Sequence, residues 1–515
     1  MGEPFYITTA ISYPNGPPHI GHAYESITTD VVARFQRLRG RDVFFLTGTD
    51  EHGLKMAQAA RERGVAPQAL ADEMSSLFRE MNERLHISFD RFIRTTEADH
   101  HRASQALWEA MAAKGDIYLG RYEGWYSVRD EAYYDEAELA VADTGEKFSP
   151  QGTPVEWTVE ESWFFRLSAY QHRLLAHYAA NPDFIRPEAR RNEVLRFVEG
   201  GLSDLSISRA SFDWGVKVPG SGSHVMYVWL DALTNYLTGI GYPDVESEAY
   251  KRYWPADIHA IGKDVVRFHA VYWPAFLMSA DLPLPRQVFG HGHVLLRGEK
   301  MSKSAGNVVS PEAMADAFGV DALRYFLVRD VTFGQDGSYS PEAIVTRVNA
   351  DLANSFGNLA QRTLSFIAKN CGSELPQGGK GDPADAALLE QVRDALTREL
   401  PAHFETLALS QGVEAWIRAV FACNQYIDAQ APWVLRKSDP DRMTAVLETL
   451  VEAIRMLAIA IQPVIPGAAG RLLDQLGVAP QDRGWSALEG PARPFAGFLA
   501  APPQPIFPRM DLPEG

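Results

Sequence analysis

Two short segments of the chain carry side chains suited to holding a phosphate chain. Residues 14–22 read PNGPPHIGH, and residues 300–307 read KMSKSAGN. His19 and His22 lie three residues apart, so on a helix they share one face, and a helix start adds N–H groups that attract an anion. Lys300 and Lys303 lie in a Ser- and Gly-flanked loop that can grip a polyphosphate and then release it. Either segment alone could be an exposed turn, but together they favour a nucleotide site.

A parallel sheet is the element expected to position these segments. Residues 5–11 and 42–46 are rich in β-branched and aromatic side chains, and each run is followed by a loop and by apolar residues at helical spacing. Such βα units build a doubly wound, Rossmann-like α/β fold, in which ligands bind at the carboxyl ends of the strands. Asp50 follows the second strand, where it could pair with an amino group or simply cap the turn.

The pattern of residue types changes several times along the rest of the chain. Aromatic hairpin-like runs broken by Gly and Pro suggest an insertion, a helix is predicted over 225–239, and apolar residues three or four apart predict a terminal α-helical bundle. The expected organisation is a first half of the catalytic domain at 1–116, an inserted connective domain at 117–224, the second half at 225–290, a loop and junction region at 291–342, and an α-helical domain at 343–515.

Composition limits the classes of function. The chain has 49 Lys and Arg against 66 Asp and Glu, a net charge of −17, which argues against non-specific coating of nucleic acid but allows a local basic face. The apolar stretch at 268–280 is too short to span a membrane. Cys371 and Cys423 are too few for a disulfide framework or a thiolate zinc site. The strand at 5–11 leaves no room for a presequence, which favours a cytoplasmic location.

The order of the two phosphate segments on such a sheet resembles that of the class I aminoacyl-tRNA synthetases. Four further segments are similar to methionyl-tRNA synthetases: AISYPNG at 10–16, GTDEHG at 48–53, YVWLDA at 227–232 and GKD at 262–264. The resemblance spans nearly the whole chain. It implies ATP-dependent activation of L-methionine to methionyl-adenylate, followed by transfer to the 3′ end of methionine tRNA.

The resemblance also implies roles for individual residues. His19, His22, Lys300 and Lys303 would stabilise charge on the α-phosphate and the departing pyrophosphate, with Mg²⁺ supplied by solvent. The methionine-binding residues would be Ile11, Tyr13, Asp50, Trp229, Tyr236, Val265, Phe268 and His269. The ATP-binding residues would be Gly21, Glu25, Gly262, Lys263, Asp264, Val294 and Lys303. From helical spacing alone, the aromatic residues would more often be plain core.

The helical end contains a possible RNA-reading set. Asn358 and Arg362 lie four apart on a predicted helix, and Trp433 follows a proline at a predicted helix start. Loop bases of RNA are read by aromatic stacking and by Arg or Asn on base edges. Without the resemblance, a core tryptophan and a surface pair would be the better interpretation. The resemblance implies that the three residues read the CAU anticodon of initiator and elongator methionine tRNAs.

The sequence departs from the family in the insertion and at the C-terminal end. Many relatives bind zinc through Cys pairs there, but residues 126–138 contain no Cys, so no zinc or other metal site is expected. The acidic cluster in this stretch is expected to be a solvated hairpin; it comprises Asp130, Glu131, Asp135, Glu136 and Glu138. The insertion looks too small for a separate editing domain, and the chain lacks the extension that some relatives use to dimerise, which favours a monomer.

Three alternatives to this interpretation stay open. One is another small class I synthetase, whose pocket would not be expected to match Asp50, Trp229, Tyr236 and His269 together. A second is a non-catalytic tRNA-binding scaffold, although a retired site has no reason to keep both histidines and both lysines. A third is a small-molecule nucleotidyltransferase, which would not account for the long helical domain.

Overall fold

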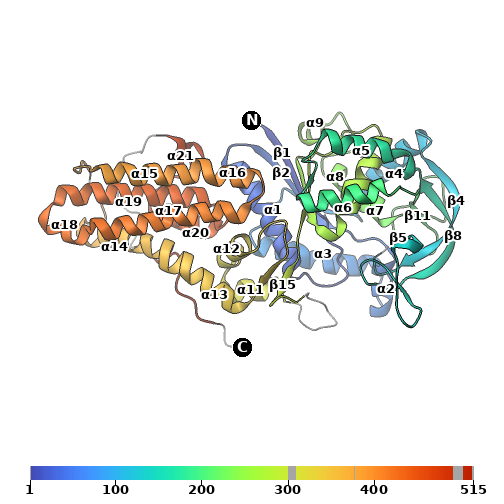
Figure 1. Cartoon of the computed structure of the whole chain (residues 1–515), viewed down its shortest axis with the longest axis horizontal. Coiled ribbons are helices and arrows are strands. Elements are labelled where there is room, and N and C mark those ends of the chain that lie inside the picture. Colours follow the sequence, from blue (N-terminus) through green and yellow to red (C-terminus); the bar gives the residue numbers. More distant parts are fainter. Residues whose placement is uncertain (1, 131, 300–308, 376, 491–502, 513–515) are drawn as a thin grey trace.

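The computed structural model describes residues 2–130, 132–299, 309–375, 377–490 and 503–512. The molecule is elongated, with a bundle of long helices at one end and the sheets at the other (Figure 1). None of the helices within these ranges is long and apolar enough to cross a membrane.

A six-stranded, fully parallel sheet forms the centre of the catalytic half, as the βα pattern predicted. In spatial order its strands are β3 (Arg91–Arg94), β2 (Asp42–Thr49), β1 (Pro4–Thr9), β13 (Ile258–Gly262), β14 (Val288–His291) and β9 (Ile185–Arg186). The edge strand β9 comes from the segment expected to be an insertion, so that segment also contributes to the parallel sheet.

Alternation along the strands divides the core into two layers. In β1, Phe5 and Ile7 point into one buried cluster and Tyr6 into the other, because successive strand residues face opposite sides of a sheet. The first cluster continues through α1 (Ile20–Leu38) into the helical bundle, and the second continues into the inserted segment. The parallel sheet is therefore covered on both faces.

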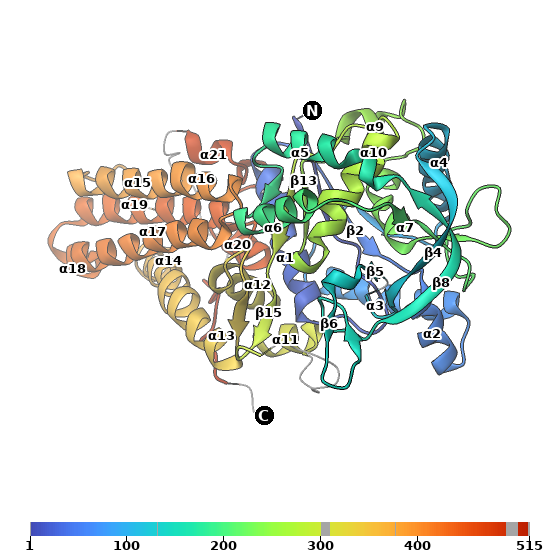
Figure 2. The same cartoon turned by 45° about the vertical axis from the view of Figure 1, so that its right-hand side comes forward.

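An antiparallel ribbon extends from the catalytic half at the end opposite the bundle (Figure 2). Its sheet contains β10 (Leu205–Ser206), β8 (Glu156–Phe165), β4 (Ile117–Ser127) and β5 (Ala132–Tyr134) in spatial order. Short pairs elsewhere are β6 (Ala140–Val141) with β7 (Lys147–Phe148), β11 (Ser208–Arg209) with β12 (Val225–Met226), and β15 (Val294–Leu296) with β16 (Gly337–Tyr339). The hairpin texture of the sequence is thus confirmed as a sheet.

The helices of the catalytic half fill the connections between the strands. They include α2 (Leu54–Arg63), α3 (Pro67–Arg84), α4 (Ala98–Ala113), α5 (Gln171–Ala180), α6 (Glu188–Glu199), α9 (Glu248–Tyr253), α10 (Trp273–Ser279), α11 (Pro311–Phe318) and α12 (Val320–Asp330).

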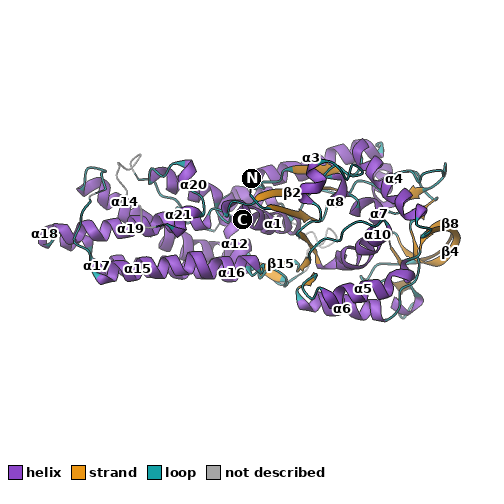
Figure 3. Ribbon diagram, turned by 90° about the horizontal axis from the view of Figure 1, so that it is seen from above, coloured by secondary structure: helices purple, strands orange, loops and turns teal. Residues whose placement is uncertain are grey.

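The terminal bundle is helical, as its apolar spacing predicted, and its long helices run side by side along the molecule (Figure 3). Its main helices are α13 (Pro341–Arg347), α14 (Asn358–Asn370), α15 (Pro383–Asp394), α16 (Leu400–Glu405), α17 (Leu409–Gln430), α18 (Pro432–Ser438), α19 (Pro440–Ile461), α20 (Pro466–Gln475) and α21 (Ser486–Glu489). π-helical segments join α13 to α14 (Val348–Gly357) and α15 to α16 (Ala395–Glu399).

The single helix predicted over 225–239 is wrong in detail. Residues 225–226 form strand β12, and the rest forms two short helices, α7 (Val228–Leu233) and α8 (Asn235–Thr238). Thr234 lies between them, where its hydroxyl donates to the carbonyl of Leu230 at 2.8 Å. Such back-bonding by threonine competes with a regular helix.

Candidate active site

A cavity of about 240 Å³ lies where three central strands end. Ile11 and Tyr13 follow β1, Asp50 follows β2, and Val265 follows β13, so the cavity occupies the carboxyl edge of the parallel sheet. This is the position at which such sheets bind ligands. All eight residues expected to bind methionine line it: Ile11, Tyr13, Asp50, Trp229, Tyr236, Val265, Phe268 and His269. The strand predicted to reach residue 11 ends at Thr9, which lets the next residues turn inward.

Aromatic rings form one wall of the cavity. Trp229 stacks on Phe268 with ring centroids 3.8 Å apart and an interplanar angle of 5°. Phe268 begins a π-helix (Phe268–Tyr272) that runs into α10, so His269 also faces the cavity. A thioether sulfur packs favourably beside aromatic rings. The wall is therefore suited to a flexible, sulfur-containing side chain.

The histidine in this wall is neutral and has a defined tautomer. Nδ1 of His269 lies 2.9 Å from the carbonyl of Val265, which can only accept, so Nδ1 carries the proton. Nε2 then accepts the hydroxyl of Tyr236 at 2.6 Å. Burial lowers the pKa of His269 to about 4. The pair therefore presents polar atoms to the cavity without a net charge.

The two carboxylates of the loop 48–53 point in different directions. Asp50 is 6% exposed and lines the cavity, and its N–H donates to the carbonyl of Ser12 at 2.8 Å. Glu51 is buried and accepts a bidentate pair of bonds from Arg94, at 2.7 and 3.0 Å. Gly53 has φ +104°, a conformation that side chains other than hydrogen strongly disfavour, and it lets the chain turn into α2. Of the two carboxylates, Asp50 thus lines the cavity and Glu51 does not.

A buried Asp–His network behind the cavity was not predicted. Asp231 lies 2.7 Å from Nδ1 of His52 and 2.7 Å from Nε2 of His100. Burial alone would raise the pKa of Asp231, but the two imidazoles hold it well below its ordinary value. Because Asp231 lies on α7 with Trp229, the network ties the Asp50 loop to the aromatic wall.

The inserted segment closes the cavity from the outside. Arg129, Asp130 and Gln151 line it. Asp130 was expected to be part of a solvated hairpin; instead it accepts bonds from the hydroxyls of Ser149 and Thr153, both at 2.6 Å. That expectation is therefore wrong for Asp130.

The two histidines of the first phosphate segment cap α1. His19 is the N-cap residue and its ring stacks on that of His22, with centroids 3.8 Å apart. Nδ1 of His19 accepts the N–H of Gly21, and Nδ1 of His22 accepts the N–H of His19, both at 3.1 Å. Each neutral ring therefore carries its proton on Nε2. The sequence analysis expected open N–H groups at this helix start. In the structure, the N–H groups of His19 and Gly21 are instead bonded to the two histidine rings.

The absence of a side chain at Gly21 leaves room for this stacked arrangement. A Cβ atom at Gly21 would lie 2.9 Å from Cε1 of His19, closer than side-chain atoms normally approach. Gly21 was expected to contact ATP; in the structure its missing side chain makes room for the His19 ring, and the ATP contact stays a prediction.

The residues expected around adenosine lie near the end of β13 and along the neighbouring strands. Asp264 lines the cavity and lies 2.6 Å from Nε2 of His293. Lys263 donates to Asp336 at 2.7 Å, and Gly262 precedes it at the strand end. Glu25, on α1, lies 2.8 Å from Nε2 of His291. Val294 is buried at the start of β15. The histidines at 291 and 293 were not predicted, although the sequence GHGH at 290–293 is unusual enough to have drawn attention.

Lys300 and Lys303 lie outside the described residues. The first described residue after their segment, Val309, accepts the N–H of Ile20 at 3.3 Å. Val309 therefore contacts the start of α1, next to His19.

A second, smaller cavity of about 150 Å³ lies at the far end of the bundle. Arg362 and Trp433 both line it, with the guanidinium carbon 5.3 Å from the indole centroid. Trp433 is 44% exposed. Asn358 is exposed one turn earlier on α14, the helix that carries Arg362. Of the three predicted RNA-reading residues, Arg362 and Trp433 thus lie beside each other, and Asn358 lies one turn away on the same helix as Arg362.

Within the part of the chain that the structure describes, no group of three or more His, Cys, Asp or Glu side chains is arranged to hold a metal ion. The expectation of a zinc-free insertion stays a prediction.

Comparison with known proteins agrees with this geometry. A family model described as tRNA synthetases class I (M) matches residues 5–364, and one described as the anticodon binding domain of methionyl tRNA ligase matches residues 375–493. The methionine–tRNA ligase of Mycobacterium tuberculosis is 58% identical over 516 residues, which cover 99% of each chain. That of Brucella suis is 58% identical over 508 residues, covering 98% of each chain.

A solved structure gives the same result in three dimensions. The M. tuberculosis methionyl-tRNA synthetase in complex with methionyl-adenylate superimposes with a TM-score of 0.96 and 58% identity, over 98% of this chain and 100% of that one. With both family models, full-length relatives and a closely superimposing structure in agreement, the chain belongs to the methionyl-tRNA synthetase family of class I aminoacyl-tRNA synthetases.

Proposed function

We propose that this chain is a methionine–tRNA ligase, which activates L-methionine with ATP to methionyl-adenylate and transfers the methionyl group to methionine tRNA, releasing pyrophosphate and AMP. The observation that carries the proposal is the convergence of one buried carboxylate, one aromatic stack and one neutral Tyr–His pair on a single cavity at the carboxyl edge of the sheet. The relative that superimposes on the chain was solved with methionyl-adenylate, which supports the same assignment.

In this proposal the cavity holds methionine by its two ends. Asp50 pairs with the ammonium group, because a buried carboxylate favours an opposite charge. The thioether packs against the wall that contains the stacked rings of Trp229 and Phe268. The hydrogen-bonded pair of Tyr236 and His269 stays neutral, so it accepts an uncharged side chain and disfavours a charged one.

Catalysis in this proposal consists of positioning and charge stabilisation. The methionine carboxylate is itself the nucleophile and attacks the α-phosphate, so the protein need not supply one. The Nε2–H groups of His19 and His22 donate to phosphate oxygens, and Lys300 and Lys303 neutralise the departing pyrophosphate. Mg²⁺ enters bound to ATP. Asp264 is suited to accept the ribose hydroxyls, because its carboxylate borders the cavity.

In this proposal the helical bundle binds the anticodon of the tRNA. Trp433 would stack on an unpaired base of the CAU anticodon, with Arg362 and Asn358 on base edges. We further propose that the protein works as a monomer in the cytoplasm and holds no zinc.

Exchange of labelled pyrophosphate into ATP tests the activation step without tRNA. The purified protein is assayed with each of the twenty amino acids in turn. Exchange that depends on methionine supports the proposal. Exchange with a different amino acid would keep the class and overturn the pocket assignment, and no exchange from folded protein would favour a tRNA-binding scaffold.

A further inference from the structure

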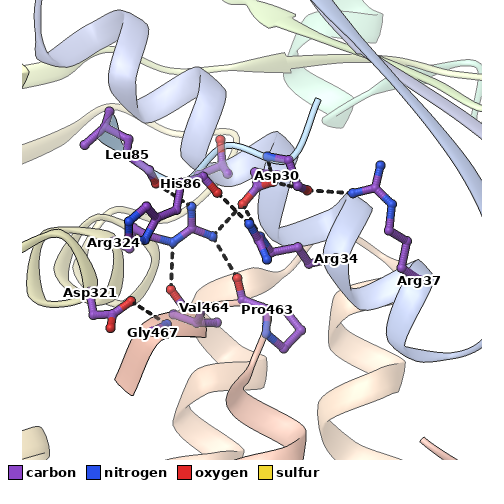
Figure 4. Close-up of polar contacts among 12 residues, drawn as sticks. Asp30, Arg34, Arg37, Leu85, His86, Asp321, Arg324, Pro463, Val464 and Gly467 are labelled. Carbon is purple, nitrogen blue, oxygen red and sulfur yellow. Dashed lines mark hydrogen bonds and ion pairs between the residues drawn. The ribbon is translucent and has the colours of Figure 1, made fainter. Parts of the chain in front are cut away.

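A fully buried arginine lies at the junction of the catalytic half and the bundle (Figure 4). Arg324, on α12, donates from Nε to the carbonyl of Val464 at 3.0 Å and from one terminal nitrogen to the carbonyl of Pro463 at 2.8 Å. Its other terminal nitrogen donates to the carbonyl of Leu85 at 3.1 Å. Residues 463 and 464 form the turn between α19 and α20, so one side chain joins α12, the end of α3 and the bundle.

The charge of this arginine is balanced by a carboxylate on the helix that begins at the catalytic histidines. Asp30, on α1, is fully buried and accepts from Arg324 at 2.7 Å. It also accepts from Nε of Arg34 at 2.7 Å and from the N–H of Ser88 at 2.7 Å. Burial alone would raise the pKa of Asp30, but the two guanidinium groups and Ser88 hold it below its ordinary value.

The same helix contributes a second, oppositely charged contact to the bundle. Asp321 lies three residues before Arg324 on α12, so both face the α19–α20 turn. Its carboxylate accepts the N–H groups of Gly467 and Ala468, at 3.3 and 2.6 Å, and so caps the first turn of α20. Arg324 thus donates to carbonyls that follow α19, and Asp321 accepts from the first N–H groups of α20. We call Asp30, Asp321 and Arg324 the α12 clasp.

The clasp lies where two functional helices meet. His22 precedes Asp30 by eight residues on α1, about 12 Å at the helical rise. Trp433 lies at the start of α18, which leads directly into α19, and α19 runs 22 residues, about 33 Å, to the clasp. One helix therefore connects the clasp to the catalytic histidines and the other connects it to the indole at the far end of the bundle.

Stability alone is a weak reason for such a clasp. Desolvating two charges costs about as much as their attraction returns, and well-packed apolar side chains often replace a buried ion pair without loss. Apolar side chains cannot reproduce the directed bonds that one planar guanidinium makes to three carbonyls, in two backbone segments, and to one carboxylate. These bonds fix the orientation of the bundle relative to α1 and α12.

We propose that Arg324 is a positioning residue for tRNA charging, which holds the bundle at the angle to α1 that lets a tRNA bound through its anticodon present its 3′ end to the adenylate. This inference rests on the proposed function, because it concerns the transfer step of the same reaction.

The test compares charging of two tRNAs by a variant whose Asp30–Arg324 pair is neutralised. In Asp30→Asn/Arg324→Met, here called the clasp variant, these two charges are removed together, so that neither is left without the other, and Asp321 keeps its bonds to α20. The matched control is Glu452→Gln/Arg455→Met, which removes a buried ion pair of 2.6 Å that lies wholly inside the bundle. Each protein is assayed for methionine-dependent pyrophosphate exchange, and for charging of a methionine tRNA transcript with its CAU anticodon and of the same transcript with a CUA anticodon.

The clasp variant should lose charging of the CAU transcript by about tenfold in kcat/KM, within the range typical of coupling between two sites. Its pyrophosphate exchange and its residual charging of the CUA transcript should stay within about threefold of wild type, a difference of less than 1 kcal/mol. The discrimination between the two transcripts therefore narrows in the clasp variant and stays unchanged in the control, a result that general destabilisation would not give.

Unchanged discrimination in the clasp variant, or an equal narrowing in the control, would overturn the inference. If the clasp variant does not fold, Asp321→Ala decides in the same assays, because it removes both bonds to the start of α20 and leaves the fully buried Asp30–Arg324 pair in place. Narrowed discrimination in Asp321→Ala would support the inference, and unchanged discrimination would overturn it. A wild-type protein that activates methionine but charges neither transcript would overturn the proposed function, and the inference with it, whereas parallel losses in exchange and charging would overturn the inference alone.

Discussion

The carboxylate of Asp50 offers the sharpest test of how the cavity holds its amino acid. The change Asp50→Asn keeps the shape of the side chain and removes its charge. Asp50 is 6% exposed and its N–H is bonded to the carbonyl of Ser12, so its side chain has little freedom to move toward solvent. An ammonium group held there is desolvated and depends on this one charge.

The expected magnitude follows from that burial. Truncating one partner of a buried, hydrogen-bonded charge pair costs about 2–5 kcal/mol. Taking about 3 kcal/mol, and 1.4 kcal/mol for each factor of ten, kcat/KM for methionine in pyrophosphate exchange should fall by about 10²-fold. The loss should appear mainly in KM for methionine, with KM for ATP little changed.

A deaminated substrate analogue provides the control. 4-(Methylthio)butanoate has the thioether and the carboxylate of methionine but no ammonium group, so its inhibition constant should be no weaker in Asp50→Asn than in wild type. The reasoning would be refuted if Asp50→Asn reduced kcat/KM by less than about fivefold, or if the variant bound the analogue and methionine with equal losses.

Three further outcomes follow from the site. Lys303→Ala should slow adenylate formation by about 10²–10³-fold in single-turnover assays, the cost of one aimed transition-state donor, while methionine binding followed by tryptophan fluorescence stays unchanged. Trp433→Ala should lower kcat/KM for tRNA charging by about 5- to 150-fold, the worth of one stacked base, with full pyrophosphate exchange; equal losses in both would remove the stacking role. The pKa of His269 is about 4, below that of the unfolded chain, so the unfolded state takes up the proton first and stability present above pH 6.5 is lost as the pH falls from 6.5 toward 4. Between pH 7 and pH 5 this costs about 2 kcal/mol, to be measured by denaturant unfolding as a difference between wild type and His269→Gln; an identical pH dependence of the two would contradict it.

Much of the fold and the cavity could be predicted from the sequence because their signals are local. Strand texture at 42–46 and helical spacing through Ile27, Val31 and Phe35 reflect burial on a short repeat. Asp50 was found because the loop after a parallel strand reaches the binding edge of its sheet. The remaining pocket residues came from the resemblance, since spacing alone favoured plain core for the aromatic residues.

The parts that escaped prediction depend on partners far apart in the chain. Asp231 meets His52 and His100 across 179 and 131 residues, and no short pattern marks such a triad. From the sequence, Asp130 cannot be told apart from the exposed carboxylates near it. Its hydroxyl donors, Ser149 and Thr153, are about twenty residues away and reach it only in the folded insertion. Arg324 reads as an ordinary helix residue, because the carbonyls that it binds come from a turn 140 residues later.

The central claim is that the chain joins methionine to tRNA, and direct charging tests it most simply. The wild-type protein is incubated with ATP, Mg²⁺, labelled methionine and total bacterial tRNA, and the acylated tRNA is isolated and identified. We expect ester-linked methionine on the tRNAs with a CAU anticodon, initiator and elongator alike, and on no other. Label on tRNAs of another specificity, or none in a protein that carries out pyrophosphate exchange, would contradict the account.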